Sequence, residues 1–195
     1  MQNKILISLI VVFIYSNFSA QNIDYVLLKD INNSYTTSGG KIQSVFSNSV
    51  TPIMIGVPAG ILAYSLFKKD SIARQKFYTI VSSELFSGII TTSLKLAFKR
   101  ERPFTTYPND IFKHSDAGSY SFPSGHTSAA FSLATSVSLE FPKWYVIAPT
   151  MLWAGTVGYS RMYLGVHYPS DVLVGAIIGA GTSYLCYKAN KWIRH

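Results

Sequence analysis

Hydrophobic residues follow one another in five long runs after residue 50. The runs cover roughly residues 52–67, 77–98, 128–141, 145–159 and 172–187. Their length predicts helices, although some are shorter than the ~20 residues that a bilayer span needs. Ser, Thr and Gly recur within them. The pattern therefore leaves two structures open: a bundle of mostly transmembrane helices, or a soluble helical bundle with an unusually apolar core.

The N-terminus has the pattern of an export signal. Lys4 precedes an apolar run over residues 5–15, and the small polar stretch SNFSA ends at Ala20. This order predicts a signal peptide over residues 1–20, cleaved after Ala20; the alternative is an uncleaved first membrane helix. Both place the following residues outside the cytoplasm. We expect residues 21–50 to form a non-cytoplasmic N-terminal segment, with a turn or loop at SYTTSGGK.

Basic residues between the runs favour the membrane structure. The stretch LFKKDSIARQKF, residues 66–77, holds four basic side chains, and the C-terminal KANKWIRH is also basic. Alternate crossings from an outside N-terminus put both stretches in the cytoplasm, as the positive-inside rule requires. Residues 99–127 and 160–171 then lie outside.

Composition adds a preference for anionic partners. The 195 residues include 17 Lys and Arg against 9 Asp and Glu, which gives a formal charge of +8. Such a balance suits a nucleic acid, an anionic lipid or a phosphorylated substrate. The single cysteine, Cys186, excludes an intramolecular disulfide. The length allows one domain, and no repeat or linker divides it.

The first cluster of candidate chemistry is KLAFKRERP, residues 95–103. Lys95 and Arg102 are seven residues apart, close to two helical turns, which predicts that they share one face of a helix ended by Pro103. The alternative is a basic helix end that favours the helix dipole or reaches to the lipid surface.

The second cluster, PSGHT, has the features of a helix start. Pro123 and Ser124 precede the apolar run, with Ser124 in the N-cap position. Gly125 allows a ligand to approach the backbone, and free amides at a helix N-terminus bind anions. His126 falls in the first turn, where a bound anion would be needed to hold the ring protonated. The alternative is a capped helix with a surface histidine.

The third cluster, SRMYLGVHYPSD, joins the last two runs. Arg161 ends one predicted helix, and a turn at Gly165 precedes His167. Asp171, four residues after His167, can accept a hydrogen bond from Nδ1 of the ring, which leaves Nε2 free as a nucleophile. The alternative is a structural His–Asp pair.

All three clusters fall on the same predicted side of the membrane. Together they supply three cations, two histidines, one carboxylate and a helix N-terminus. Fixed donors of this kind suit the oxyanion of a phosphoryl transfer.

The clusters resemble the three-part signature of the type 2 phosphatidic acid phosphatase (PAP2) family, which includes lipid phosphate phosphatases, bacterial acid phosphatases and vanadium haloperoxidases. Every signature position is matched between residues 95 and 171, as Lys95-x6-Arg102-Pro103, Pro123-Ser124-Gly125-His126 and Ser160-Arg161-x5-His167-x3-Asp171. The resemblance, to the bacterial membrane-bound branch, implies an all-α bundle of five to six mostly transmembrane helices. It makes residues 51–195 the phosphatase domain, with the active site at the helix ends on the non-cytoplasmic side.

The resemblance also implies roles for the matched residues. His167 is the expected nucleophile, which forms a phosphohistidine, and Asp171 orients it. His126 protonates the leaving oxygen and later activates water. Five groups are expected to bind the phosphate oxygens: the side chains of Lys95, Arg102, Arg161 and Ser124, and the amide of Gly125. No metal and no other cofactor is implied.

A membrane-embedded site implies a lipid substrate at the periplasmic face of the bacterial inner (cell) membrane. The candidates are a polyprenyl diphosphate, phosphatidate, phosphatidylglycerol phosphate or a lipid A phosphate; the sequence leaves the head group and the oligomeric state open. Alternatives are a soluble exported acid phosphatase of broad specificity in the periplasm, a vanadium haloperoxidase, for which the chain is short, and a membrane scaffold with a decayed site. We expect no nucleic-acid partner, because the cations lie at helix ends and not along one exposed face.

Other polar residues receive lesser roles. We expect His114 and Asp116 to lie in a solvated loop, and Glu84 to make a polar contact between helices. Lys99 and Arg100 are expected to attract an anionic substrate without taking part in the chemistry.

Overall fold

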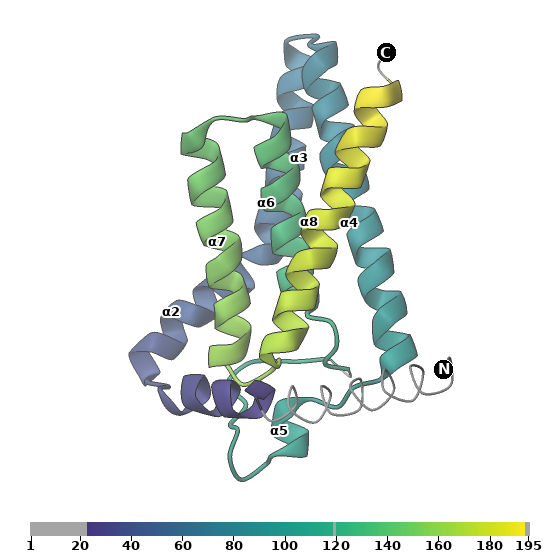
Figure 1. The fold of residues 1–195 in the computed structure, drawn as a ribbon. Helices are drawn as coiled ribbons and strands as arrows, with labels where there is room; N and C mark the ends of the chain where they lie inside the picture. Colours follow the sequence, from purple (N-terminus) through teal and green to yellow (C-terminus); the bar gives the residue numbers. More distant parts are fainter. Residues whose placement is uncertain (1–22, 119, 194–195) are drawn as a thin grey trace, which may run out of the picture.

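Helices form all the regular structure that the computed structural model describes, which is residues 23–118 and 120–193 (Figure 1). A helix over residues 23–33, here the N-terminal helix, comes first. The others are α2 (Thr37–Asn48), α3 (Val50–Phe67), α4 (Ser71–Phe98), α5 (Pro103–Thr106), α6 (Gly125–Glu140), α7 (Trp144–Tyr163) and α8 (Pro169–Ile193). The predicted all-α fold is confirmed. The predicted signal peptide, residues 1–20, lies outside the described residues.

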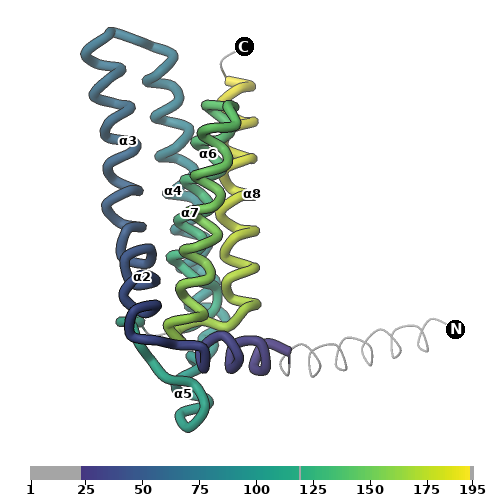
Figure 2. The backbone as a smooth tube through the Cα atoms, turned by 90° about the vertical axis from the view of Figure 1, so that its left-hand side faces the viewer, coloured from purple at the N-terminus to yellow at the C-terminus, as the bar shows by residue number. Residues whose placement is uncertain are grey.

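Five long helices run alongside one another, and each predicted apolar run falls on one of them. Figures 1 and 2 show α3, α4, α6, α7 and α8 as a bundle, with the N-terminal helix, α2 and α5 gathered toward one end. The α3–α4 turn and the α6–α7 turn lie at the opposite end. Alternation of direction therefore brings the ends of α4 and α7 together with the beginnings of α6 and α8.

The predicted turn at SYTTSGGK is shorter than expected. Residues 34–36 form the turn, and α2 begins at Thr37. The physical reason is the cap: the hydroxyl of Thr36 accepts a hydrogen bond from the amide of Gly39 at 3.1 Å, which starts a helix despite two glycines.

Small hydroxyl side chains line the inside of the bundle around α6, which packs against α3, α4, α7 and α8. The Ser128 hydroxyl lies 2.6 Å from the Ser87 hydroxyl and accepts a hydrogen bond from Thr91 at 2.8 Å. Such residues let helix backbones approach closely while their polar atoms stay paired. They also lower the hydropathy of a helix that is enclosed by others.

Two glycines of α8 press its backbone against α6. A Cβ atom at Gly175 would lie 2.7 Å from the carbonyl oxygen of Ser124, and one at Gly179 would lie 2.2 Å from that of Ser128. Only glycine fits such contacts. This close packing fixes the register of the two helices, and the Ser124 amide donates to the Asp171 carbonyl oxygen at 3.0 Å.

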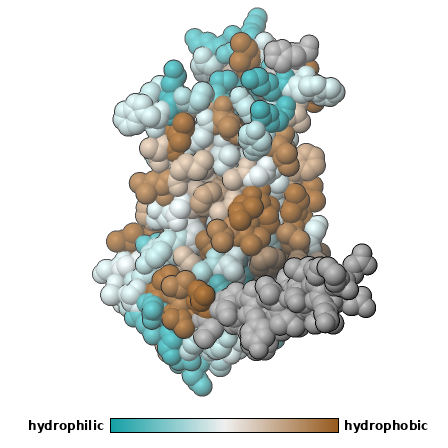
Figure 3. Space-filling view, in the orientation of Figure 1, coloured by the Kyte–Doolittle hydropathy of each residue, from teal (hydrophilic) through white to brown (hydrophobic). Residues whose placement is uncertain are grey.

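The outside of the bundle is apolar between two polar ends. Large side chains such as Leu152 (74% exposed) and Leu185 (67% exposed) face outward. Figure 3 shows hydrophobic side chains across the middle of one face and hydrophilic ones at its ends. Among the described residues, two stretches are long and apolar enough to cross a membrane, Thr37–Phe67 and Pro169–Ile193. The exterior therefore suits the predicted membrane bundle.

Candidate active site

The predicted nucleophile and its orienting carboxylate lie side by side. His167 follows α7 in the turn before α8, and Asp171 occupies the first turn of α8. Nδ1 of His167 is 3.4 Å from Oδ2 of Asp171. Both residues are buried, with His167 only 2% exposed. The expected His–Asp pair therefore exists in a place that water hardly reaches.

Arg102 holds the other side of the His167 ring. Its Nη1 lies 3.3 Å from Nε2 of the imidazole. A guanidinium has no acceptor atom, so Nε2 must present its lone pair and Nδ1 must carry the proton toward Asp171. Burial lowers the pKa of His167 to about 3, and Asp171 opposes that shift only in part. The ring is neutral at neutral pH, in the tautomer that a nucleophile at Nε2 needs.

Lys95 and Arg102 converge, although not as predicted. The two residues do not share a helix face, because α4 ends at Phe98 and Lys99 adopts a left-handed conformation with φ of 48°. Arg102 is extended and precedes α5, with Pro103 as the first residue of that helix. The Lys95 ammonium and Arg102 Nη2 nevertheless donate to one carbonyl oxygen, that of Tyr120, at 2.8 and 3.1 Å.

Arg102 is further fixed by two backbone carbonyls. Nε donates to Gly118 at 2.8 Å and Nη1 donates to Val166 at 2.7 Å. The second bond ties the guanidinium to the residue before His167. The loop before α6 and the turn before α8 are therefore joined through one side chain.

Arg161, the third predicted cation, is buried at the end of α7 with 2% of its surface exposed. Nη1 donates to the hydroxyl of Ser47 on α2, and Nη2 lies 3.5 Å from the carbonyl oxygen of Asp116. Its Nε is buried and has no hydrogen-bond partner among the described residues. A buried donor without an acceptor costs free energy, so this nitrogen is suited to receive one from a ligand.

The three cations share one property that Arg100 lacks. Their described partners are carbonyl oxygens, a hydroxyl oxygen and, for Arg102, the ring nitrogen of His167. In the described part of the chain no carboxylate forms a salt bridge with any of them. Arg100, in contrast, pairs with two carboxylates. Partly buried positive charge without a counter-charge is costly, so Lys95, Arg102 and Arg161 form a site for an anion.

The N-terminus of α6 adds backbone donors. Ser124 takes the predicted N-cap position, but its side chain makes no capping hydrogen bond in the described residues. Its hydroxyl instead accepts a bond from Thr127 at 2.8 Å. Gly125 is the first helical residue of α6. A Cβ atom added to Gly125 would lie 3.9 Å from Cε of Lys95. Amides without a side-chain cap at a helix start are donors for an anion.

A polar cavity of about 330 Å³ opens beside His126 and Arg161. Ser44 and Asn48 of α2 line it, together with the loop over residues 114–116. The expectation of a solvated loop is therefore only partly right. Asp116 is exposed, but the His114 ring stacks on Tyr35 at a centroid distance of 3.6 Å, which holds the loop against the cavity.

Sequence reasoning missed the residues around Asp171. Arg100 Nη1 donates to Oδ1 of this carboxylate at 2.8 Å. Arg100 was predicted to attract an anionic substrate, but its guanidinium is instead bound to Asp171. The Ser121 hydroxyl donates to Oδ2. Arg100 also pairs with Asp24 of the N-terminal helix. A basic residue two positions before Arg102 was the only sequence signal for this arrangement.

Comparison with known proteins assigns the family. A sequence model of the PAP2 superfamily matches residues 77–194, which include every predicted site residue. The chain belongs to the PAP2 superfamily.

Several similar proteins bear the names of lipid phosphatases. The chain is 30% identical over 168 residues to an undecaprenyl-diphosphatase of Sulfolobus acidocaldarius, covering 85% of this chain and 78% of that protein. It is 43% identical over 70 residues to a lipid A 4'-phosphatase of Bacteroides thetaiotaomicron, but this match covers 36% of this chain and only 31% of the relative's length. The predicted class of enzyme, a membrane-bound phosphatase, is confirmed at the level of the family.

A solved PAP2-type structure has the same fold. The crystal structure of Aquifex aeolicus LpxE aligns with a TM-score of 0.73 and 27% identity, over 83% of this chain and 93% of that one. The all-helical arrangement is thus shared across nearly the whole of the solved protein.

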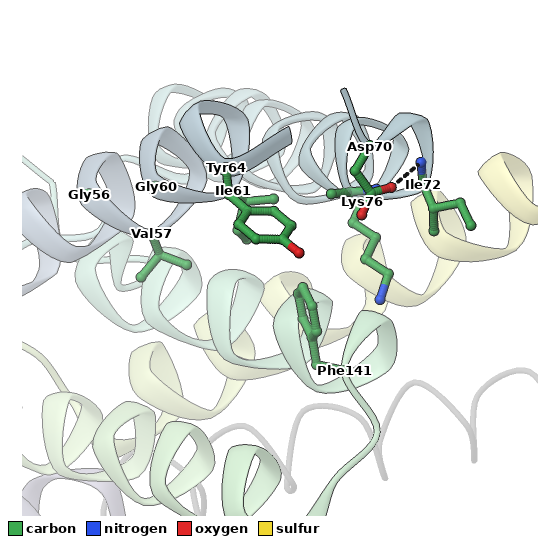
Figure 4. A pocket seen from close by; sticks show the side chains of 10 residues that line it. Gly56, Val57, Gly60, Ile61, Tyr64, Asp70, Ile72, Lys76 and Phe141 are labelled. Atoms are coloured by element: carbon green, nitrogen blue, oxygen red, sulfur yellow. Dashed lines mark hydrogen bonds between the residues drawn. The ribbon is translucent and has the colours of Figure 1, made fainter. Parts of the chain in front are cut away.

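Another cavity of this PAP2 protein is larger than the one beside His126 and lies away from the signature. It measures about 630 Å³ and lies where α3 and α4 join, at the other end of the bundle (Figure 4). Its two charged groups are already engaged: the Asp70 carboxylate caps α4, and the Lys76 ammonium donates to the Glu140 carbonyl oxygen at 2.9 Å. The bulk of its lining is apolar, so the signature end remains the candidate active site.

In residues 23–118 and 120–193, no group of three or more His, Cys, Asp and Glu side chains has the arrangement of a metal site. Independence from metal remains a prediction, and activity in a chelator tests it.

Proposed function

We propose that the protein hydrolyses a lipid phosphate or diphosphate at the periplasmic face of the bacterial inner membrane, through a phosphohistidine intermediate. One observation carries the proposal. Three cations without a carboxylate partner lie at the same end of the bundle as a neutral histidine, whose Nε2 faces one of them, Arg102. An anion with several oxygens satisfies all three cations at once, and a phosphoryl group also offers an atom for the histidine to attack.

In the first step, Nε2 of His167 attacks the phosphorus and the bond to the leaving oxygen breaks. Arg102 exchanges its contact with Nε2 for a phosphate oxygen, while Lys95, Arg161 and the amides of α6 hold the other oxygens. The charge of the bound phosphate holds the His126 ring protonated, and His126 gives this proton to the leaving oxygen. The ring of His167 becomes positive, and the nearby Asp171 stabilises that charge.

In the second step, His126 takes a proton from water, and the hydroxide attacks the phosphorus. The N–P bond breaks, inorganic phosphate leaves and the neutral ring of His167 is restored. Both proton transfers use His126, so the enzyme returns to its starting state after each turnover. Asp171 keeps the proton on Nδ1 throughout.

A lipid substrate fits the apolar exterior and the relatives. The site lies at one end of a bundle that carries many outward-facing hydrophobic side chains, which Figure 3 shows on one face, so a head group at the bilayer surface can reach it. The relatives' names include both a lipid A phosphatase and an undecaprenyl-diphosphatase. These names support a lipid phosphate or diphosphate as the substrate class.

The periplasmic orientation rests on charge. The basic turn around Lys68 lies at the end opposite the site, and so does the C-terminus of α8 (Figure 1). The positive-inside rule then puts the site outside. A cysteine at Ser115, in a chain with Cys186 replaced, should react with a membrane-impermeant thiol reagent added to the periplasmic side. Labelling only after the inner membrane is opened would reverse the orientation.

The activity test measures phosphate release by detergent-solubilised protein in EDTA. The panel holds a polyprenyl diphosphate, phosphatidate, phosphatidylglycerol phosphate, a lipid A phosphate and a soluble aryl phosphate, with His167→Ala as the control. We expect turnover of one lipid well above the aryl phosphate and none by His167→Ala. Equal turnover of the aryl phosphate would favour a broad acid phosphatase. Loss of activity in EDTA would contradict the metal-free mechanism.

A further inference from the structure

The N-terminal helix, residues 23–33, lies across the site end of the bundle in both views (Figures 1 and 2). It falls outside the segment that matches the PAP2 superfamily. Its inner face carries Asp24, Leu28 and Asn32, spaced by four residues, and all three are buried. A buried carboxylate on a helix outside the matched segment needs a partner, and its partners lead to the active site.

Asp24 uses both of its carboxylate oxygens at the start of α8. Oδ1 accepts a hydrogen bond from the Ser170 amide at 2.8 Å. Oδ2 accepts from Arg100 Nη2 at 2.9 Å and from the Ser170 hydroxyl. The residue next to Asp171 in the chain and the guanidinium next to Asp171 in space are therefore held by one carboxylate.

Arg100 is fixed on three sides. Nη2 is bound by Asp24, and Nη1 donates to Oδ1 of Asp171 at 2.8 Å and to the Ser170 hydroxyl at 2.7 Å. The guanidinium carbon lies 3.9 Å from the centroid of the Tyr168 ring. Paired charges and a stacked ring leave the planar group one orientation.

This orientation decides what Asp171 can do. Because Arg100 binds Oδ1, the other oxygen is turned to Ser121, to the Tyr168 amide at 3.0 Å and to Nδ1 of His167 at 3.4 Å. If Arg100 moved, Oδ1 would lose its charged partner, and only the Ser121 hydroxyl and the Tyr168 amide would still hold the carboxylate. The contact that holds the tautomer of His167 would then be less firmly fixed.

The rest of the inner face keeps Asp24 in place. Asn32 donates from Nδ2 to the carbonyl oxygens of Phe112 and Tyr163, at 3.1 and 3.0 Å, and accepts from the Phe112 amide at 2.8 Å. Leu28 packs with Ile111 and Tyr168. These contacts join the helix to both sides of the turn that carries His167.

We propose that Asp24 is a positioning residue for the hydrolysis: it holds Arg100, which holds Asp171 in the orientation that His167 requires. The proposal rests on the proposed function, and it adds a part of the machinery that lies outside the three-part signature. The simpler role for Asp24 is to cap α8 through the Ser170 amide, which affects stability alone. The two roles predict different results for one substitution.

The substitution is Asp24→Asn, which keeps an oxygen for the Ser170 amide but removes the charge that Arg100 binds. A hydrogen bond to a charged group contributes about 1.5 kcal/mol or more, so we expect kcat to fall about tenfold or more with KM unchanged. The matched control is Asp30→Asn, which makes the same charge change at an exposed position of the same helix. Its kcat should equal that of the wild type.

A double-mutant cycle tests the route through Arg100. If Asp24 acts only through Arg100, the Asp24→Asn, Arg100→Gln protein should be no slower than Arg100→Gln alone. If the double variant lost kcat by the product of the two single losses, Asp24 would not act through Arg100. Wild-type kcat in Asp24→Asn, or a lower melting temperature with wild-type kcat per folded molecule, would overturn the positioning role.

A measurement without turnover separates this proposal from the proposed function. Nitrogen-15 NMR of the His167 imidazole reports the Nδ1–H tautomer. We expect Asp24→Asn to shift these signals and Asp30→Asn to leave them unchanged. Equal spectra would overturn the positioning role. If Asp24→Asn shifts the His167 signals but the wild-type protein hydrolyses none of the panel, the positioning role stands and the proposed reaction is overturned.

Discussion

Arg102 Nη1 lies 3.3 Å from Nε2 of His167, so the cation that is expected to bind the phosphate also contacts the atom expected to attack it. The contact holds the lone pair in the direction of the anion site. An arriving phosphate can take over this donor without any movement of the ring. In the proposed reaction, the binding of the phosphate therefore also releases the nucleophile.

Arg102→Lys should damage catalysis although it keeps the charge. A lysine cannot reproduce the donors that bind Gly118, Val166 and Tyr120 at once. Loss of one fixed donor in an oxyanion site costs on the order of a hundredfold in rate, so kcat/KM should fall by about that factor. Steady-state phosphate release measures it. Arg74→Lys, at an exposed position of α4, is the control and should have no effect.

Asp171→Asn should cost more than Arg102→Lys. An amide in this position offers a donor to Nδ1 and favours the tautomer whose Nε2 carries the proton. A roughly 10⁴-fold loss of kcat is the expectation from an oriented histidine in other hydrolases. Circular dichroism and size-exclusion chromatography check that the protein is folded. Activity within tenfold of the wild type would remove Asp171 from the mechanism.

The sequence was sufficient for the five long helices and for the grouping of the candidate site residues at one end of them. Five apolar runs predicted five helices, since burial in a bundle or a bilayer requires apolar stretches of that length. The motifs placed His167, Asp171 and Arg161 around one turn. The side chains of Lys95, Arg102, His167 and Asp171 are joined by direct contacts or by a shared acceptor.

The rest depended on backbone conformations and distant contacts. Nothing in KLAFKRERP signals that Lys99 turns left-handed, because lysine seldom adopts a positive φ. The shared helix face was therefore a reasonable error. Asp24 meets Arg100 across 76 residues of sequence, a distance over which no local pattern carries information. Only the fold reveals that the N-terminal helix reaches the site.

Stability should fall in acid because His167 is buried without its proton. Its pKa is about 3 in the folded protein, against an ordinary value of 6.5. Between these values the unfolded chain binds a proton that the folded protein does not, so the free energy of unfolding decreases as the pH falls. The contribution is constant above pH 6.5 and amounts to about 2 kcal/mol lost at pH 5.

Thermal unfolding in detergent at pH 7.5 and pH 5 measures this loss. His167→Gln has no titrating ring at this position, so its melting temperature should fall less between the two pH values. The comparison with the variant removes the contribution of the other histidines. Equal decreases in both proteins would show that His167 is protonated as easily in the folded state as in the unfolded chain.

Gly179→Ala should destabilise the bundle through the contact of α8 with α6. The new Cβ would lie 2.2 Å from the Ser128 carbonyl oxygen, so the backbones must separate. Overpacking of this kind costs roughly 1–3 kcal/mol. The control is Gly181→Ala on the same helix, whose Cβ would meet no described atom within 4 Å. A lower melting temperature for Gly179→Ala alone is the expected result, and equal values would argue against close packing.

Arg161 should decide how tightly the site binds a free anion. Its buried Nε lacks a partner in the described chain, and phosphate or vanadate would supply the missing acceptor. At a concentration 100 times its dissociation constant, a ligand stabilises the folded state by about 2.7 kcal/mol, a rise of roughly 5 °C or more in melting temperature for a chain of this size. Vanadate should also inhibit turnover, because it can adopt the five-coordinate geometry of the transferred phosphoryl group.

Arg161→Lys keeps the charge but has no Nε and no planar fork, so it should bind the anion more weakly. We expect the rise in melting temperature at the same vanadate concentration to shrink in this variant, while potassium chloride of equal ionic strength stabilises neither protein. The two proteins must be compared with their own anion-free melting temperatures, because Arg161 also donates to Ser47 and its loss lowers stability by itself. Equal rises would mean that the anion is bound without the Nε of Arg161, and that the cations at Lys95 and Arg102 are sufficient for binding.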